Sequence, residues 1–185
     1  ILSQSTSDAN CYRGWAALTD RYSDWDAVLA APEGEVEETI RPAGLAKQKS
    51  GTILSVLTRL REENGHLSLS HLEAMDDSEA IDYLTSFKGV GVKTAACVLC
   101  FALGRDVIPV DTHVHRISNR LGWVRTKTPD QTERALEEVL PRRYWIPINE
   151  LLVRFGQSVC TPLSPFCSRC PIGQHCSRIG VGSFR

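Results

Sequence analysis

The sequence lacks the features that mark membrane and secreted proteins. It contains no run of about 18 apolar residues, so no transmembrane helix is expected. No basic and then apolar leader precedes a small-residue cleavage site, so secretion is not indicated. The chain also has no initial methionine and opens on Ile1-Leu2-Ser3 in the middle of a helical pattern, so we expect that an N-terminal segment is missing.

The seven cysteines argue against a disulfide framework. Their number is odd, four of them are clustered, and Cys11, Cys97 and Cys100 lie in apolar helical patterns. This usage fits an intracellular, reducing compartment, which is the cytoplasm or nucleoid if the protein is bacterial.

The clustered cysteines are Cys160, Cys167, Cys170 and Cys176, with the spacing C-x6-C-x2-C-x5-C. Thiolates this close repel one another unless a soft cation or cluster neutralises them. Zinc sites more often pair two short C-x2-C steps, and this chain has one. The pattern therefore favours a [4Fe–4S] cluster, with zinc and disulfides as the alternatives.

The net charge of −1 hides an uneven distribution. Residues 1–105 carry 10 Lys and Arg against 15 Asp and Glu, whereas residues 106–185 carry 11 against 7. The basic second part is a candidate phosphate-facing surface. An ordinary solvated surface explains the charge equally well.

The apolar residues recur with a helical period over most of the chain. Helices are predicted from the capping candidate Asp8 to Tyr22, from Leu45 to Asn64, from about Ser78 to Phe87 and from Gly91 to Gly104. Others are marked by Val114, Ile117 and Leu121, by a Thr128-Pro129-Asp130-Gln131 capping box, and by the stripe from Ile148 to Val159. Pro109 makes a paired strand unexpected in the one extended link. The fold class is therefore all-α.

The segment Phe87-Lys88-Gly89-Val90-Gly91-Val92-Lys93-Thr94-Ala95 lies between two predicted helices. Two glycines around one apolar residue permit a tight turn with positive φ, and the amides after them favour an anion such as phosphate. A lone G-x-G also fits an ordinary helix–helix turn. The residues after the turn favour a functional site, because Lys93 lies on the first turn of the next helix and Val110-Asp111-Thr112-His113 begins another.

These segments resemble the helix–hairpin–helix DNA glycosylases, in particular the endonuclease III family with its iron–sulfur loop. The match comprises F-K-G-V-G-V-K-T-A, V-D-T-H and the four cysteines, and weaker similarity covers nearly the whole chain. The resemblance implies two helical domains flanking a DNA-binding cleft. One is a six-helix barrel over 1–105 that ends in the helix–hairpin–helix at about 78–104. The other is the iron–sulfur domain over 106–185, with its cluster loop at 160–176.

The resemblance places the nucleophile at Lys93 and its partner carboxylate at Asp111, on opposite walls of the cleft. A neutral amine can attack the sugar C1′ and form a Schiff base, which permits strand cleavage by β-elimination. The carboxylate can accept a proton or stabilise the oxocarbenium-like sugar, and it can also cap a helix. Monofunctional relatives have Ser or Tyr at the lysine position.

A stacked base must be rotated out of the duplex before its glycosidic bond can be reached. The resemblance therefore implies a plug, an apolar wedge and backbone contacts, for which the candidates are Gln4, Ser5, Leu45, Lys88, Gly89, Gly91, Thr94, His113 and Arg169. The hairpin carbonyls are a candidate site for a monovalent cation. Alternatively, Leu45 belongs to the core, Gln4 is merely exposed and His113 is structural. The family commonly has Leu-Pro where this chain has Phe87-Lys88.

The leading hypothesis is a monomeric, bifunctional DNA glycosylase and AP lyase that acts on oxidised or ring-saturated pyrimidines. Its partner is duplex DNA with a damaged base or an abasic site, and no membrane partner is expected. The alternatives are a monofunctional mismatch or uracil-type glycosylase and a non-catalytic iron–sulfur module that binds DNA.

Overall fold

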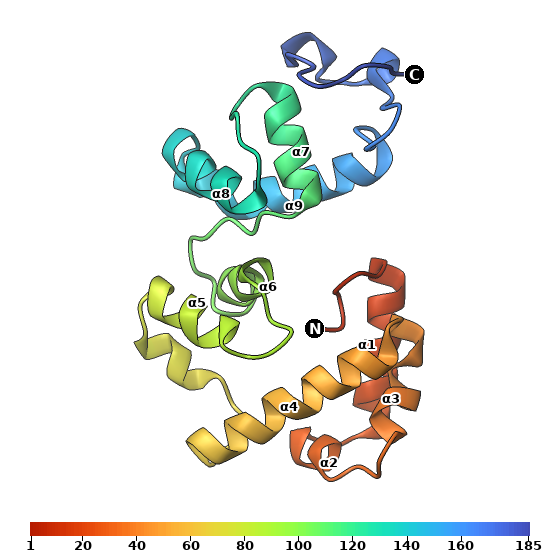
Figure 1. The fold of residues 1–185 in the computed structure, drawn as a ribbon, viewed down its shortest axis with the longest axis vertical. Coiled ribbons are helices and arrows are strands. Elements are labelled where there is room, and N and C mark those ends of the chain that lie inside the picture. The colour runs from red at the N-terminus through yellow and green to blue at the C-terminus, as the bar shows by residue number, and fades with distance from the viewer. The chain divides into compact units, whose positions relative to one another are not determined.

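The computed structural model describes residues 1–185, and its regular elements are all helical, which confirms the predicted all-α fold (Figure 1). The chain divides into two compact units, 1–91 and 92–185. The division falls inside the hairpin, whereas the sequence predicts a boundary after residue 105. Each unit has its own hydrophobic core.

The first unit is built around the long helix α4. Its elements are α1 (Asp8–Arg21), α2 (Trp25–Leu29), α3 (Glu35–Thr39), the 3₁₀ turn η1 (Arg41–Ala43), α4 (Ala46–Asn64), η2 (Ser70–Ala74) and α5 (Asp77–Thr85). The α4 residues Ile53 and Leu57 are buried with Leu18 of α1, Val36 of α3 and Ile40. Gly65 ends α4 in the left-handed conformation, as the Asn64-Gly65 stop predicts.

Local hydrogen bonds set the starts of the helices. The side chain of Ser7, not Asp8, caps α1 by accepting from the amide of Asn10, because Asp8 already lies in the first turn. Asp76 and Glu79 form a reciprocal capping box that begins α5. Thr128 caps α8 as predicted, and its side chain accepts from the amide of Gln131. The Gln131 side chain accepts from the amide of Lys127, which is one residue before the cap, rather than from the amide of Thr128 itself.

The second unit begins with α6 (Val92–Cys97), which continues into a π-helical segment, η3 (Val98–Ala102). The single helix predicted over 91–104 is therefore α-helical only in its first part. The remaining elements are α7 (Thr112–Leu121), α8 (Pro129–Val139), η4 (Arg142–Tyr144), α9 (Trp145–Ser158), η5 (Cys167–Arg169) and η6 (Gly173–His175). Val114 and Ile117 of α7, Leu136 of α8, and Trp145 and Leu152 of α9 form its core.

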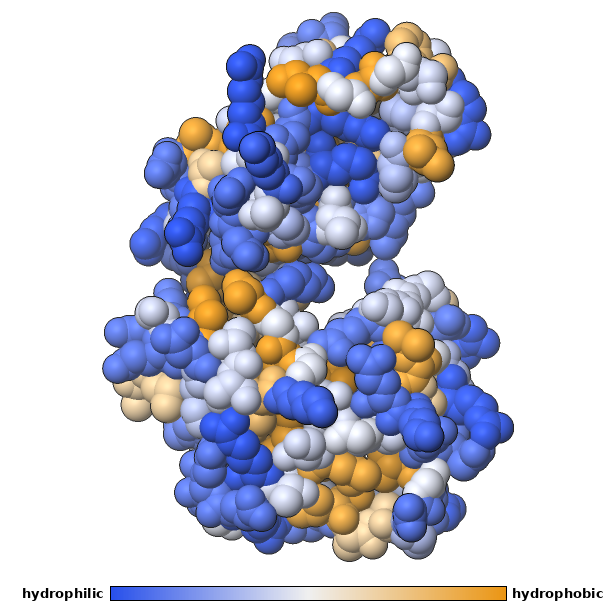
Figure 2. All heavy atoms as spheres, in the orientation of Figure 1, coloured by the Kyte–Doolittle hydropathy of each residue, from blue (hydrophilic) through white to orange (hydrophobic).

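Many apolar side chains are buried in the two cores, and others, such as Tyr12, Phe101 and Leu151, are exposed. Figure 2 shows hydrophilic residues over most of the visible surface of each unit, with apolar residues in scattered groups. None of the helices combines the length and apolar character needed to cross a membrane.

Candidate functional site

The hairpin joins α5 to α6, and Gly89 is the residue that shapes it. Gly89 has a φ of 87°, and a Cβ there would lie 2.9 Å from the Thr52 side-chain oxygen on α4. Val90 is buried, as expected for a residue that pins the turn. The positive φ that the two glycines permit occurs at Gly89 and not at Gly91, which has open space where a Cβ would stand.

Phe87, one of the two departures from the family pattern, is accommodated by local packing. Its side chain is buried, the Tyr83 ring meets it edge-on at 5.2 Å, and the Arg59 guanidinium lies 4.5 Å from its ring centre. The adjacent Lys88 is exposed. The substitution of Phe-Lys for Leu-Pro therefore adds an exposed cation to the hairpin and leaves an apolar anchor in place.

Lys93 and Asp111 both belong to the unit 92–185 rather than to different units. Lys93 is exposed on the first turn of α6, and Thr94 beside it is half-buried. Asp111 is the N-cap of α7, and its Oδ1 accepts from the amides of His113 and Val114 at 2.8 Å each. The capping role of Asp111 is thus confirmed and uses one carboxylate oxygen.

His113 contacts Arg116 one turn along α7. The Arg116 Nη2 atom lies 3.0 Å from His113 Nδ1. Because a guanidinium has no acceptor, Nδ1 must accept, and a neutral His113 carries its proton on Nε2. Arg116 Nη2 also donates to the carbonyl oxygen of Cys160 at 2.9 Å. A Cβ on Gly156 of α9 would lie 2.3 Å from His113 Nδ1, so this packing requires glycine there.

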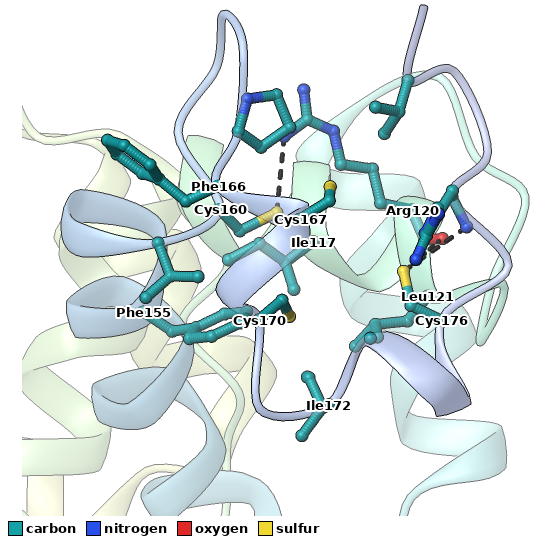
Figure 3. Close-up of a pocket in the computed structure, with 15 residues that line it drawn as sticks. Ile117, Arg120, Leu121, Phe155, Cys160, Phe166, Cys167, Cys170, Ile172 and Cys176 are labelled. Carbon is teal, nitrogen blue, oxygen red and sulfur yellow. Dashed lines mark hydrogen bonds between the residues drawn. The ribbon is translucent and has the colours of Figure 1, made fainter. Parts of the chain in front are cut away.

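The four clustered cysteines line one pocket in the second unit. Figure 3 shows Cys160, Cys167, Cys170 and Cys176 around it, with Ile117, Leu121, Phe155 and Ile172 as apolar lining. All four thiols are free, and no group of three or more His, Cys, Asp or Glu side chains converges on a point that could hold a single metal ion. The pocket is therefore rich in sulfur and enclosed by apolar side chains.

Arg120 of α7 anchors the loop that carries these cysteines. Its buried guanidinium donates to Cys160 Sγ at 3.3 Å, to the Thr161 carbonyl at 2.8 Å and to the Pro162 carbonyl at 2.7 Å. Its own carbonyl accepts from the Cys176 thiol at 3.4 Å. One residue thus contacts both ends of the four-cysteine segment.

The loop presents cations at its surface. Arg169 is exposed, and its guanidinium lies 4.0 Å from the centre of the Phe166 ring, while Arg185 lies 4.1 Å from the same ring. Arg178 is exposed and has a positive φ of 53°. Of these three cations, Arg178 lines the cysteine pocket itself.

The remaining cysteines lie outside the pocket, as the helical pattern predicts. Cys100 is buried in η3, and burial, with smaller effects of Cys97 and Asp106, raises the pKa of its thiol to about 11. A thiol in this state is protonated and unreactive at neutral pH.

The candidate plug and wedge lie in the first unit. Gln4 donates from Nε2 to the carbonyl of Gly89 at 3.0 Å, and Ser5 beside it is exposed. Leu45 is 54% exposed, so the alternative that it belongs to the core is wrong. Ser5 and Leu45 both have positive φ, 48° and 49°, which is unusual for residues other than glycine.

Sequence reasoning did not identify Lys49, Arg116 or Arg120 as site residues. A signal exists for Lys49, because it falls four residues after Leu45 and four before Ile53, on the apolar stripe of α4. Arg116 and Arg120 are likewise four residues apart on α7. Charged side chains at such positions indicate buried polar contacts.

Comparisons with known proteins give consistent matches. The family model for the HhH-GPD superfamily of base excision DNA repair proteins matches residues 1–142. Endonuclease III of Thermotoga maritima is 37% identical over 188 residues, covering 100% of this chain and 84% of that protein. A putative DNA glycosylase of Arabidopsis thaliana is 38% identical over 92% of this chain, which spans only 56% of that protein.

A solved structure of a trapped covalent endonuclease III–DNA intermediate superposes with a TM-score of 0.81 at 30% identity. It covers 96% of this chain and 79% of that protein. A thermostable thymine-DNA glycosylase, at 21% identity and a TM-score of 0.75, shares the fold.

Proposed function

Because the chain belongs to the endonuclease III family, within the HhH-GPD superfamily of base excision DNA repair proteins, we propose that it is a bifunctional glycosylase and AP lyase. It excises oxidised or ring-saturated pyrimidines from duplex DNA and then nicks the strand. The observation that carries the proposal is the exposed Lys93 at the start of α6, directly after the hairpin, in the same unit as the helix-capping Asp111.

In the proposed reaction, the amine of Lys93 bonds to C1′ as the C–N glycosidic bond breaks and the base departs with the bond's electron pair. Ring opening gives a Schiff base, and loss of a proton from C2′ then expels the 3′ phosphate by β-elimination. Asp111 stabilises the cationic sugar or accepts a proton. Its hydrogen bonds to two α7 amides hold the carboxylate in place for this role.

The plug, wedge and hairpin are proposed to hold the distorted duplex. Gln4 and Ser5 face the orphaned base, and the exposed apolar side chain of Leu45 supports the stack. Backbone amides around Gly89 and Gly91, with Lys88, contact phosphate. His113 donates a hydrogen bond to the DNA from Nε2, because its Nδ1 is already occupied by the contact with Arg116.

The four cysteines fit a [4Fe–4S] cluster, which would be held by Cys160, Cys167, Cys170 and Cys176. Four thiols that line one pocket, with one short C-x2-C step flanked by steps of six and five, suit a multi-atom cluster better than one zinc ion. When bound, the cluster supplies a rigid support for the loop. This support holds Arg169 and Arg178 at the surface, where they contact the DNA backbone.

The test is borohydride trapping of the purified protein on a duplex that contains an abasic site. Wild-type protein is expected to give a covalent adduct, and Lys93→Gln is expected to give none, because borohydride reduces the Schiff base formed by that amine. Lys127→Gln removes an exposed lysine of the same unit to which no DNA contact is assigned, and this matched control should still trap.

Duplex affinity is measured alongside. Lys93→Gln should bind the duplex nearly as well as wild type, because phosphate contacts dominate affinity. Excision that leaves intact abasic sites and no adduct would instead identify a monofunctional glycosylase. Binding without excision or trapping would identify a non-catalytic module.

A further inference from the structure

Lys49 of α4 is a buried cation whose hydrogen-bonding partners are backbone atoms. It is 2% exposed, and its ammonium donates to the carbonyl oxygens of Leu2 and Ala43 at 2.8 Å each. Burial lowers the pKa of Lys49 from its ordinary value. A buried ammonium is unfavourable unless its protons are paired, so these two bonds account for how it is tolerated.

The Leu2 carbonyl belongs to the loop that carries the candidate plug, and the Ala43 carbonyl ends η1, directly before the segment that carries the candidate wedge. Leu2 precedes Gln4 and Ser5, and Ala43 precedes Leu45. Each of these two segments contains a residue other than glycine with positive φ, Ser5 at 48° and Leu45 at 49°. Such conformations persist only where surrounding contacts hold the backbone, and they cluster at functional sites.

Further contacts hold these two segments against α1 and the hairpin. Ala43 is fully buried, and it approaches Gly14 of α1 so closely that a Cβ there would lie 2.7 Å from the Ala43 Cβ. Gln4 is bonded to the hairpin at the carbonyl of Gly89, and Gly89 itself packs on Thr52, three residues after Lys49 on α4. One turn of α4, from Lys49 to Thr52, therefore contacts the plug loop, the residue before the wedge segment and the hairpin, which are the three segments expected to engage DNA.

We propose that Lys49 is a positioning residue for base extrusion: it holds the segment of Ser5 and the segment of Leu45 at a set separation, so that these two exposed side chains enter the duplex together. The inference rests on the proposed function and names a residue that touches neither DNA nor the reacting atoms. Without the two bonds, the strained conformations at Ser5 and Leu45 can relax, and the two side chains lose their common placement.

The test compares two reactions of Lys49→Met, which keeps the length of the side chain and loses its donors. Single-turnover excision of an oxidised pyrimidine from duplex DNA should fall on the order of 100-fold, since small misplacements have effects of that size. Borohydride trapping on a single-stranded abasic oligonucleotide should be unchanged, because no base has to leave a stack. Lys47→Met, at an exposed position of the same helix, is the matched control and should alter neither reaction.

A double-variant cycle separates positioning from general destabilisation. If Lys49 acts through the wedge, Leu45→Ala should cost much less in the Lys49→Met background than in wild type. Fluorescence of 2-aminopurine beside the lesion should report less base extrusion in Lys49→Met. Lys49→Gln, whose side-chain amide still donates hydrogen bonds, should recover part of the activity lost in Lys49→Met. If Lys49→Met does not fold, Lys49→Gln is compared with wild type in the duplex and single-strand reactions instead.

Equal losses in the duplex and single-strand reactions, or additive losses in the double variant, would overturn the proposal and leave Lys49 a structural residue. Wild-type protein that neither excises nor traps would refute the proposed function instead. The two failures are therefore distinguishable.

Discussion

Asp111 caps α7 through one carboxylate oxygen, and its charge is the part of the residue that we propose to serve catalysis. Oδ1 accepts from two α7 amides, while the negative charge serves the proposed chemistry. Asn and Asp are about equally good helix N-caps, because both offer a side-chain oxygen to the first amides. A substitution that keeps the oxygen and removes the charge therefore tests the chemical role alone.

Asp111→Asn should lower single-turnover excision on the order of 100-fold or more while changing stability by only a few tenths of a kcal/mol. Asp111→Ala should lose the activity and, in addition, about 1 kcal/mol of stability, because the two amides lose their acceptor. Urea unfolding and excision assays on both variants measure the two effects. Full activity in Asp111→Asn would show that the residue only caps α7.

At the scale of elements, α8 contains a carboxylate in an unfavourable environment. Burial, followed by the like charges of Glu137 and Asp130, raises the pKa of Glu133 from 4.5 to about 7. The folded state therefore binds more protons than the unfolded state between these two values. Stability consequently falls as pH rises through that window and stays lower above it.

Glu133→Gln should raise the free energy of unfolding at pH 8 by on the order of 2 kcal/mol, allowing for partial solvent screening. The same variant should differ little from wild type near pH 4.5, where the native carboxyl is already neutral. Urea unfolding at the two pH values measures the difference. Glu138→Gln, at an exposed position of the same helix, is the control and should show no such pH dependence.

The helix α7 connects the proposed catalytic residue with the cysteine loop. Asp111 caps its start, Arg116 bonds to the Cys160 carbonyl, and Arg120 bonds to three groups of the loop. Burial and the nearby charge of Arg120 lower the pKa of Arg116, which shows how closely these cations are packed. The same helix that is capped by Asp111 is therefore hydrogen-bonded to the cysteine loop.

At the scale of the whole molecule, the two units have separate cores, and only the second carries the four clustered cysteines. Removal of the proposed cluster should therefore loosen the loop over 160–176 and leave the core around α1 and α4 unchanged. Chelation after ferricyanide oxidation, followed by hydrogen-exchange mass spectrometry, measures this. Equal loss of protection in both units would contradict the independence of the cores.

Much of the fold is determined by local pattern. The α4 helix and its Gly65 stop, the buried turn residue Val90 and the Thr128 cap are as predicted, because each depends on residues within a few positions. The incorrect cap at the start of α1 has a local cause, because Ser7 and Asp8 are neighbouring residues that can both cap a helix, and Ser7 takes the position.

The sequence by itself determined the helical class, the cysteine set and the motif that contains Lys93 and Asp111, because these depend on residue identity and spacing. Only the tertiary structure decided how the loops are held. Lys49 bonds to the carbonyls of Leu2 and Ala43, and Arg116 bonds to that of Cys160. Backbone carbonyls are the same at every residue, so the sequence can mark a buried donor such as Lys49 but not the carbonyl that accepts from it, which is settled only when distant segments pack together.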